Sequence, residues 1–132
     1  MPKTAANKRN SPRKEVEPLR VSNLASLENF ARLARYGEII EASSTGLLML
    51  IKRDDLIPQS LRGQLNLDSL VGDKVFLHLE DMNLEISGTV RRTEFKGKKG
   101  FLVAIDYSSE APEYWRECLM DLLPTPGELE RQ

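Results

Sequence analysis

The sequence has few of the residues that build metal centres and covalent cross-links. It contains one cysteine, Cys118, and one histidine, His78. A single cysteine excludes an internal disulfide and a cysteine-rich zinc site, and a single histidine excludes a multi-histidine metal site. We therefore expect neither a metal ion nor a cofactor. Cys118 is expected to pack on the apolar face of a helix, and His78 to lie on the outer surface of a strand.

Long hydrophobic segments and nucleotide-binding loops are also missing. No apolar run approaches the roughly 18 residues that a membrane-spanning helix needs. Residues 1–20 lack the apolar stretch of a secretory signal, so we expect a cytoplasmic protein without a membrane span. Neither a Walker-type loop nor a GxGxxG sequence occurs, and Cys118 has no histidine near it in the sequence. The sequence thus predicts a protein that is not an enzyme.

The charges that are present are distributed unevenly. The 132 residues carry a net charge of −1. Residues 1–20 hold six basic and two acidic groups (+4), and the other 112 residues hold 13 basic and 18 acidic groups (−5), which sums to −1. A basic arm on an acidic body favours an anionic partner for the arm, although a solvated tail explains the same charges. We expect a flexible basic arm over 1–15, one folded domain over 16–124 and a tail over 125–132.

Apolar residues alternate with polar ones along several short segments, which is the pattern of strands with one face on a core. The alternation is clearest over residues 75–79 and 84–91. The lysine- and glycine-rich segment 96–100 indicates a hairpin loop. The other expected elements are strands over 16–21, 37–42, 47–51 (buried on both faces or at a helix contact) and 101–107, and a turn over 43–46. A helix is expected over 115–122, where Ser109 can cap it and Pro124 stops it.

Two stretches leave their structure open. Segment 22–34 fits either a helix or a loop that returns to the sheet, and segment 52–72 is a polar connection with one short strand or turn near Leu65 and Leu67. Five or six strands with one terminal helix are typical of an all-β protein. We therefore predict a small six-stranded antiparallel barrel with a C-terminal α-helix and a flexible N-terminal arm.

Two short motifs carry binding chemistry. Arg9 and Arg13 lie four residues apart in the arm, and each guanidinium can pair with phosphate oxygens or stack on a purine. Glu41 ends a predicted strand, and its carboxylate can accept hydrogen bonds from the N1–H and N2–H of a guanine. Ser43 can bond to a backbone group or a phosphate, and Gly46 permits a backbone conformation with positive φ. The motifs together predict phosphate clamps on one element and a base reader on another.

This arrangement resembles the PilZ family, whose receptors for cyclic di-GMP carry RxxxR on an N-terminal loop and [DN]xSxxG on a later strand. Arg9 and Arg13 match the first motif, and Ser43 and Gly46 match the serine and glycine of the second. The strands, the hairpin and the terminal helix follow the same layout, so the resemblance covers about residues 8–123. It implies a PilZ-like β-barrel and a ligand site formed by Arg9, Arg13, Glu41, Ser43 and Gly46, with Lys8 and Ser44 as further candidates.

The sequence departs from the family pattern at Glu41, where the family has aspartate or asparagine. The carboxylate is kept, but one extra methylene shifts it by about a bond length and adds a rotatable bond to order. We expect a weaker or re-posed guanine contact. A second arginine pair, Arg32 and Arg35, has RxxR spacing and lies too near Glu41 in the sequence to form a separate loop. Either of these two arginines can still add a phosphate contact.

The resemblance implies a bacterial second-messenger receptor. In the family, an arm that is loose without ligand folds over cyclic di-GMP, and this change signals to a partner protein in motility or biofilm regulation. Two alternatives stay open, namely a PilZ-like adaptor that docks a protein without nucleotide, and a small barrel that binds single-stranded nucleic acid. The last would draw its charge from the arm and from Arg91, Arg92, Lys96, Lys98 and Lys99, but no exposed aromatic series accompanies them.

Overall fold

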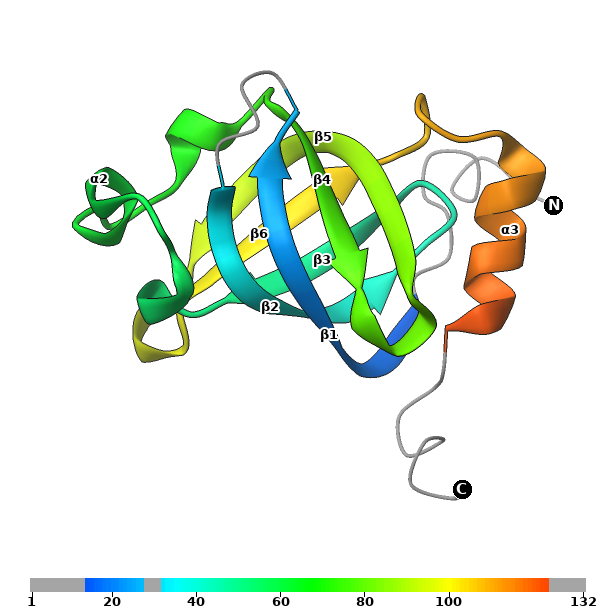
Figure 1. Cartoon of the computed structure of the whole chain (residues 1–132), viewed down its shortest axis with the longest axis horizontal. Helices are drawn as coiled ribbons and strands as arrows, with labels where there is room; N and C mark the ends of the chain where they lie inside the picture. The colour runs from blue at the N-terminus through cyan, green and yellow to red at the C-terminus, as the bar shows by residue number, and fades with distance from the viewer. Residues whose placement is uncertain (1–13, 28–31, 124–132) are drawn as a thin grey trace, which may run out of the picture.

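The computed structural model describes residues 14–27 and 32–123, and six of its strands close into an antiparallel barrel (Figure 1). A helix lies at one end of the barrel, and the irregular connection between the third and fourth strands lies at the other (Figure 1). The prediction of an all-β, six-stranded barrel with a C-terminal helix is confirmed. The elements are β1 (Lys14–Ser26), β2 (Arg32–Ala42), β3 (Gly46–Ile51), α2 (Gln59–Arg62), β4 (Lys74–Leu79), β5 (Leu84–Phe95), β6 (Phe101–Asp106) and α3 (Glu113–Leu122).

The barrel consists of two three-stranded meanders, β1-β2-β3 and β4-β5-β6, which are joined along two seams. The strand order is β1-β2-β3-β6-β5-β4. In the first seam β3 pairs with β6, from Gly46 opposite Asp106 to Ile51 opposite Phe101. In the second seam β1 pairs with β4, with Val21 opposite Leu79. β1 starts at Lys14, two residues before the predicted start of the folded domain, because its first residues pair with the end of β2.

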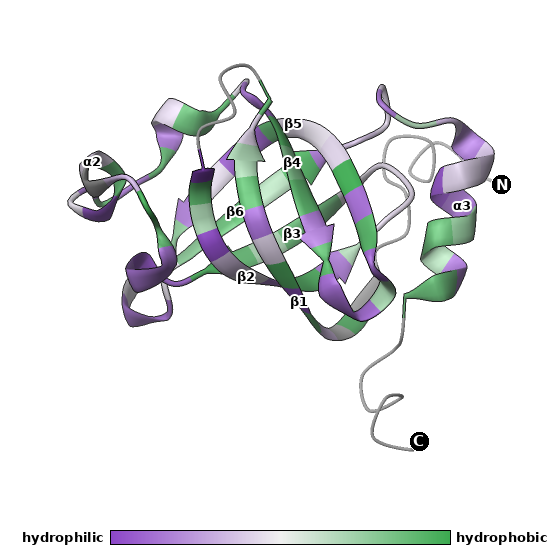
Figure 2. Ribbon diagram, in the orientation of Figure 1, coloured by the Kyte–Doolittle hydropathy of each residue, from purple (hydrophilic) through white to green (hydrophobic). Residues whose placement is uncertain are grey.

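The core fills the interior of the barrel with one face of every strand. The alternation of apolar and polar residues that marks these faces is visible along the ribbons in Figure 2. Of the two environments predicted for residues 47–51, burial on both faces is wrong, because only the inward residues of β3 are buried and Leu48 and Leu50 are half-buried on the outer face. The fully buried residues of β3, β4 and β6 include Met49, Ile51, Val75, Leu77, Leu79, Phe101 and Val103.

The two stretches that the sequence left open have defined structures. Segment 22–34 contains the end of β1 and the start of β2, and no helix forms in its described part; residues 28–31 lie outside the described residues. The connection over 52–72 contains short 3₁₀ turns and α2. Near Leu65 and Leu67 the chain turns, with the side chain of Asn66 accepting a hydrogen bond from the amide of Asp68 at 3.0 Å.

The face that α3 turns to the barrel does not include Cys118. Leu119 and the following Leu123 are buried, whereas Cys118 is exposed and Leu122 is 63% exposed. The packing role predicted for Cys118 is therefore wrong. The predicted cap is also wrong, because α3 begins at Glu113 after Pro112, four residues beyond Ser109, and no side chain caps it. No helix in the described part of the chain combines the length and apolar character needed to cross a bilayer.

His78 lies on the outer side of β4, as predicted, with Ser22 of β1 opposite it on one side and Glu85 of β5 on the other. Its side chain is half-buried. Ser22, opposite His78, is itself buried, so this part of the outer face is only partly open to solvent.

Candidate functional site

A surface pocket of about 200 Å³ opens on the outside of the barrel beside the turn between β2 and β3. Three of the residues predicted for the ligand site, Glu41, Ser43 and Gly46, line this pocket. Ser44 is not among the lining residues, and the candidates Lys8, Arg9 and Arg13 lie outside the described residues. The pocket is completed by Ala42, Thr45, Leu47, Leu48, Arg91, Arg92, Ala104, Ile105 and Asp106.

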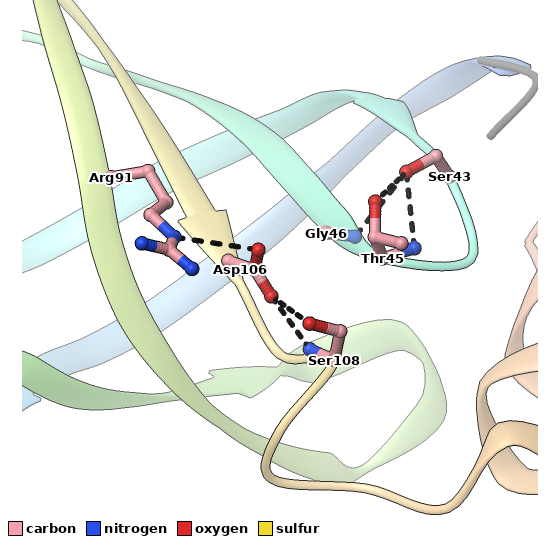
Figure 3. Close-up of polar contacts among 6 residues, drawn as sticks. All are labelled: Ser43, Thr45, Gly46, Arg91, Asp106 and Ser108. Atoms are coloured by element: carbon pink, nitrogen blue, oxygen red, sulfur yellow. Dashed lines mark hydrogen bonds and ion pairs between the residues drawn. The ribbon is translucent and has the colours of Figure 1, made fainter. Parts of the chain in front are cut away.

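The hydroxyl of Ser43 orders the turn, as Figure 3 shows. Its Oγ accepts hydrogen bonds from the amides of Thr45 at 3.2 Å and Gly46 at 3.3 Å, and it shares a hydrogen bond with Thr45 Oγ1 at 3.0 Å. The Ser43 amide in turn donates to the Gly46 carbonyl at 2.8 Å. Serine is favoured here because its short side chain can satisfy backbone groups two and three residues ahead. The predicted turn over 43–46 is confirmed.

Gly46 is required by close packing rather than by its backbone torsion. Gly46 does not use the positive φ that glycine permits, since the described glycines with positive φ are Gly72, Gly97 and Gly100. A Cβ atom on Gly46 would instead collide with the carbonyl oxygen of Ile105 on the neighbouring strand. The glycine therefore allows β3 and β6 to approach each other at the floor of the pocket.

Arg91 and Arg92 add two guanidinium groups that no sequence motif assigned to this site. The pairing of β5 with β6 shifts register between Val90 and Arg92, so a bulge at Arg91 leaves two consecutive side chains exposed. Arg91 Nε donates to Asp106 Oδ2 at 3.4 Å (Figure 3). The signal in the sequence was the break in alternation, because two adjacent arginines follow Ile86, Gly88 and Val90 in an otherwise regular strand.

Asp106 remains a carboxylate at the edge of the pocket. Burial alone would raise its pKa, but hydrogen bonds from Ser108 and the charge of Arg91 outweigh burial and hold the pKa below the usual value for aspartate. One oxygen, Oδ1, accepts from the Ser108 amide at 2.7 Å and from Ser108 Oγ at 2.6 Å (Figure 3). Asp106 therefore fixes the position of Arg91 and keeps its negative charge at neutral pH.

Tyr107, the residue after β6, stabilises the turn between β2 and β3. Its hydroxyl donates to the carbonyl of Ser43 at 2.6 Å, and its side chain is fully buried. Burial raises the pKa of Tyr107 to about 12, although the nearby charge of Arg116 opposes this shift. The hydroxyl thus keeps its proton, and the hydrogen bond to Ser43, throughout the neutral range.

The raised pKa of Tyr107 predicts a loss of stability in alkaline solution. The folded state disfavours the phenolate, so the contribution of this group is complete below about pH 10 and is lost as the pH rises toward about 12. We expect the free energy of unfolding, measured by urea titration, to fall across this interval. Tyr107→Phe should flatten the fall, whereas Tyr114→Phe, which changes an exposed tyrosine on α3, should leave it unchanged. If the free energy of unfolding falls equally in the parent protein, Tyr107→Phe and Tyr114→Phe, Tyr107 is not the cause of the alkaline loss of stability.

Arg32 and Arg35 do not reach the pocket. They lie near the start of β2, where Arg32 Nη2 donates to Asn23 Oδ1 at 3.0 Å and Arg35 Nη2 donates to the carbonyl of Asp54 at 3.1 Å. Six residues of extended strand separate Arg35 from Glu41, a distance of roughly 20 Å. The phosphate contact considered for these two arginines is therefore not supported.

Sequence comparison does not assign the chain to a family: no protein-family model matches it, and no curated protein gives a significant match.

Proposed function

We propose that this chain is a PilZ-like receptor for cyclic di-GMP that binds its ligand at the pocket beside the β2–β3 turn and closes it with the basic arm. One observation carries the proposal. Lys14 pairs with Ala42, and Glu15 pairs with Glu41, so β1 starts directly beside the pocket. Arg13 is the next residue before Lys14 in the sequence, and the RxxxR motif is thus joined to the barrel next to Glu41 and the two matching residues of the second motif, Ser43 and Gly46.

The outer face of the barrel at the pocket suits a flat purine, because an apolar surface lies there between two charged side chains. The strand pairing aligns Glu41 with Leu48, Leu48 with Ala104, and Ala104 with Arg92. Leu48 and Ala104 form an apolar middle, with a carboxylate at one end and a guanidinium at the other. Three strand spacings of about 4.8 Å make this row roughly 14 Å long, which is enough for a base and its phosphate.

The charge of the pocket explains why an arm is needed. Among the described lining residues, Glu41 and Asp106 carry negative charge and Arg91 and Arg92 carry positive charge, so the lining is neutral. A cyclic dinucleotide has two phosphates and therefore needs additional cations. Arg9 and Arg13 would supply them through charge-assisted hydrogen bonds.

Ordering of the arm on ligand binding would allow a second protein to recognise the ligand-bound state. Fixing each backbone residue costs roughly 1–2 kcal/mol, which the phosphate contacts must outweigh. The change from a loose to an ordered arm alters the surface offered to a partner. We therefore place the chain among second-messenger effectors that act through a protein partner, as in bacterial motility or biofilm regulation.

The double substitution Arg9→Ala/Arg13→Ala should abolish binding of cyclic di-GMP as measured by calorimetry, because it removes both proposed phosphate clamps. Arg32→Ala/Arg35→Ala is the matched control, since it removes the same charge from residues far from the pocket, and its affinity should stay within a few-fold of the parent protein. Unchanged affinity in Arg9→Ala/Arg13→Ala would refute the assignment of the arm.

The same titration separates the two alternative functions. A protein-docking adaptor would bind neither cyclic di-GMP nor an RNA oligomer. A barrel for single-stranded nucleic acid would bind the oligomer with an affinity that falls steeply with salt. Saturable binding of cyclic di-GMP without binding of the oligomer supports the proposed receptor.

A further inference from the structure

We propose that α3 and the β2–β3 turn (residues 43–45) form one coupled unit, in which Arg116 is a positioning residue for the pocket. Docking of α3 on the barrel holds the turn in its ordered conformation, and a ligand that uses the ordered turn favours the docked helix. The second half of this inference rests on the proposed binding of cyclic di-GMP. The first half concerns the protein alone.

Three successive carbonyl groups of the turn accept hydrogen bonds from Arg116 of α3 or from Tyr107, the residue that follows β6. The Ser43 carbonyl accepts from Tyr107 Oη at 2.6 Å, and the Ser44 carbonyl accepts from Arg116 Nη1 at 2.7 Å. The Thr45 carbonyl accepts from the Tyr107 amide at 2.9 Å. Every peptide group of this short turn is thus fixed by a donor on α3 or on the residue that follows β6.

The opposite side of the same turn faces the pocket. Ser43 and Thr45 line the pocket, and their hydroxyls bond to each other while Ser43 Oγ receives the amides of Thr45 and Gly46. A peptide group is planar, so a carbonyl cannot rotate without moving the amide of the next residue. Loss of the Arg116 bond would therefore change the amides and hydroxyls that a ligand meets.

Among the described residues, only a few side chains in and next to α3 pack it against the barrel. It spans ten residues, and Leu119 is its one buried residue, followed by Leu123 just beyond its end. Trp115 packs edge-on against Tyr107, with ring centroids 6.3 Å apart at 86°. An isolated helix of this length is unstable in water, so α3 depends on these contacts and on Arg116 to stay folded.

Arg116 is suited to couple the two parts because it bridges them. Its Nε donates to the carbonyl of Ala111 at 3.2 Å, in the segment that leads into α3, while Nη1 reaches Ser44. The side chain thus ties the entry of the helix to the turn, which lie side by side in Figure 1. If the hydrogen bond from Arg116 to Ser44 increases the affinity for a ligand by some factor, thermodynamic linkage requires that the bound ligand favours formation of this hydrogen bond by the same factor.

The test uses Arg116→Ala, with Glu117→Ala as the matched control on the exposed side of the same helix. Amide hydrogen exchange is followed by NMR at Thr45 and Gly46 in the turn and along α3, with and without cyclic di-GMP. In Arg116→Ala we expect faster exchange in both places and an affinity for cyclic di-GMP about tenfold lower, the loss typical of a hydrogen bond to a charged group. Glu117→Ala should behave like the parent protein.

Arg116→Lys keeps the charge but loses the forked geometry, so it should recover only part of the affinity. Faster exchange in α3 with unchanged exchange at Thr45 and Gly46 would overturn the coupling, as would faster exchange in α3 on addition of ligand to the parent protein. If the parent protein does not bind cyclic di-GMP at all, the proposed function fails by itself. Amide exchange at Thr45 and Gly46 in ligand-free Arg116→Ala then tests by itself whether α3 and the turn are coupled.

The folded state of each variant is checked by circular dichroism. If Arg116→Ala does not fold, Leu119→Ala provides a second route, because it weakens the docking of α3 without touching any bond to the turn. Faster exchange at Thr45 and Gly46 in Leu119→Ala supports the coupling, and unchanged exchange at these two amides contradicts it.

Discussion

Gly46→Ala is expected to destabilise the barrel by about 3 kcal/mol, the upper range for overpacking of a tight site. The added methyl group would be directed at the carbonyl oxygen of Ile105, which belongs to the backbone and cannot rotate away. β3 and β6 would have to separate locally, with loss of the pairing between Gly46 and Asp106. Urea unfolding followed by the fluorescence of Trp115, the one tryptophan in the chain, measures the change.

Gly97→Ala is the control for this substitution. Gly97 has a φ of 64°, and a methyl group there would meet no atom within 4 Å. Its replacement should cost only the backbone strain of a left-handed residue, about 1 kcal/mol. If Gly46→Ala and Gly97→Ala lose the same stability, close approach of the two strands is not the reason for glycine at position 46.

Arg91→Glu/Arg92→Glu is expected to weaken the proposed binding of cyclic di-GMP by roughly a hundredfold or more, because both guanidinium groups at the pocket become carboxylates. The lining would then change from neutral to strongly negative, which opposes any phosphate-bearing ligand. Calorimetry at constant ionic strength measures the affinity, and thermal unfolding checks that loss of the contact between Arg91 and Asp106 leaves the barrel folded.

Lys98→Glu/Lys99→Glu is the matched reversal. It changes the net charge of the protein by the same amount, but its residues lie in the loop before β6, at the end of that strand away from Asp106. Binding of cyclic di-GMP should be nearly unaffected. Equal losses in the two reversals would mean that the net charge of the protein, rather than the pocket, attracts the ligand.

The barrel was largely predictable because its strands follow a simple period. Residues 75–79 and 84–91 alternate strictly, and the glycine- and lysine-rich loop at 96–100 marks the turn between two such segments. Segment 47–51 misled the prediction, since five consecutive apolar residues resemble a strand buried on both sides. Leu48 and Leu50 instead supply apolar surface outside the barrel, and in the case of Leu48 this surface forms part of the pocket.

The features that the sequence did not predict depend on contacts between distant segments. α3 carries two neighbouring apolar stripes, one with Trp115 and Leu119 and one with Cys118 and Leu122, and its periodicity alone cannot decide which stripe faces the barrel. The role of Gly46 depends on Ile105, which lies far along the chain. The bulge at Arg91 depends on how β5 pairs with β6. Apart from the break in alternation at Arg91 and Arg92, local patterns contain none of these relations.

The division of the barrel into two meanders has a consequence for how the chain folds. Each meander is built from neighbours in sequence, whereas the β3–β6 seam joins segments that are far apart, and such long-range pairing is the slow step in forming β proteins. The pocket lies across this seam, with Gly46 on one side and Asp106 on the other. A molecule bound there would bridge the junction between the two meanders, so the proposed ligand site and the closure of the barrel depend on the same pair of strands.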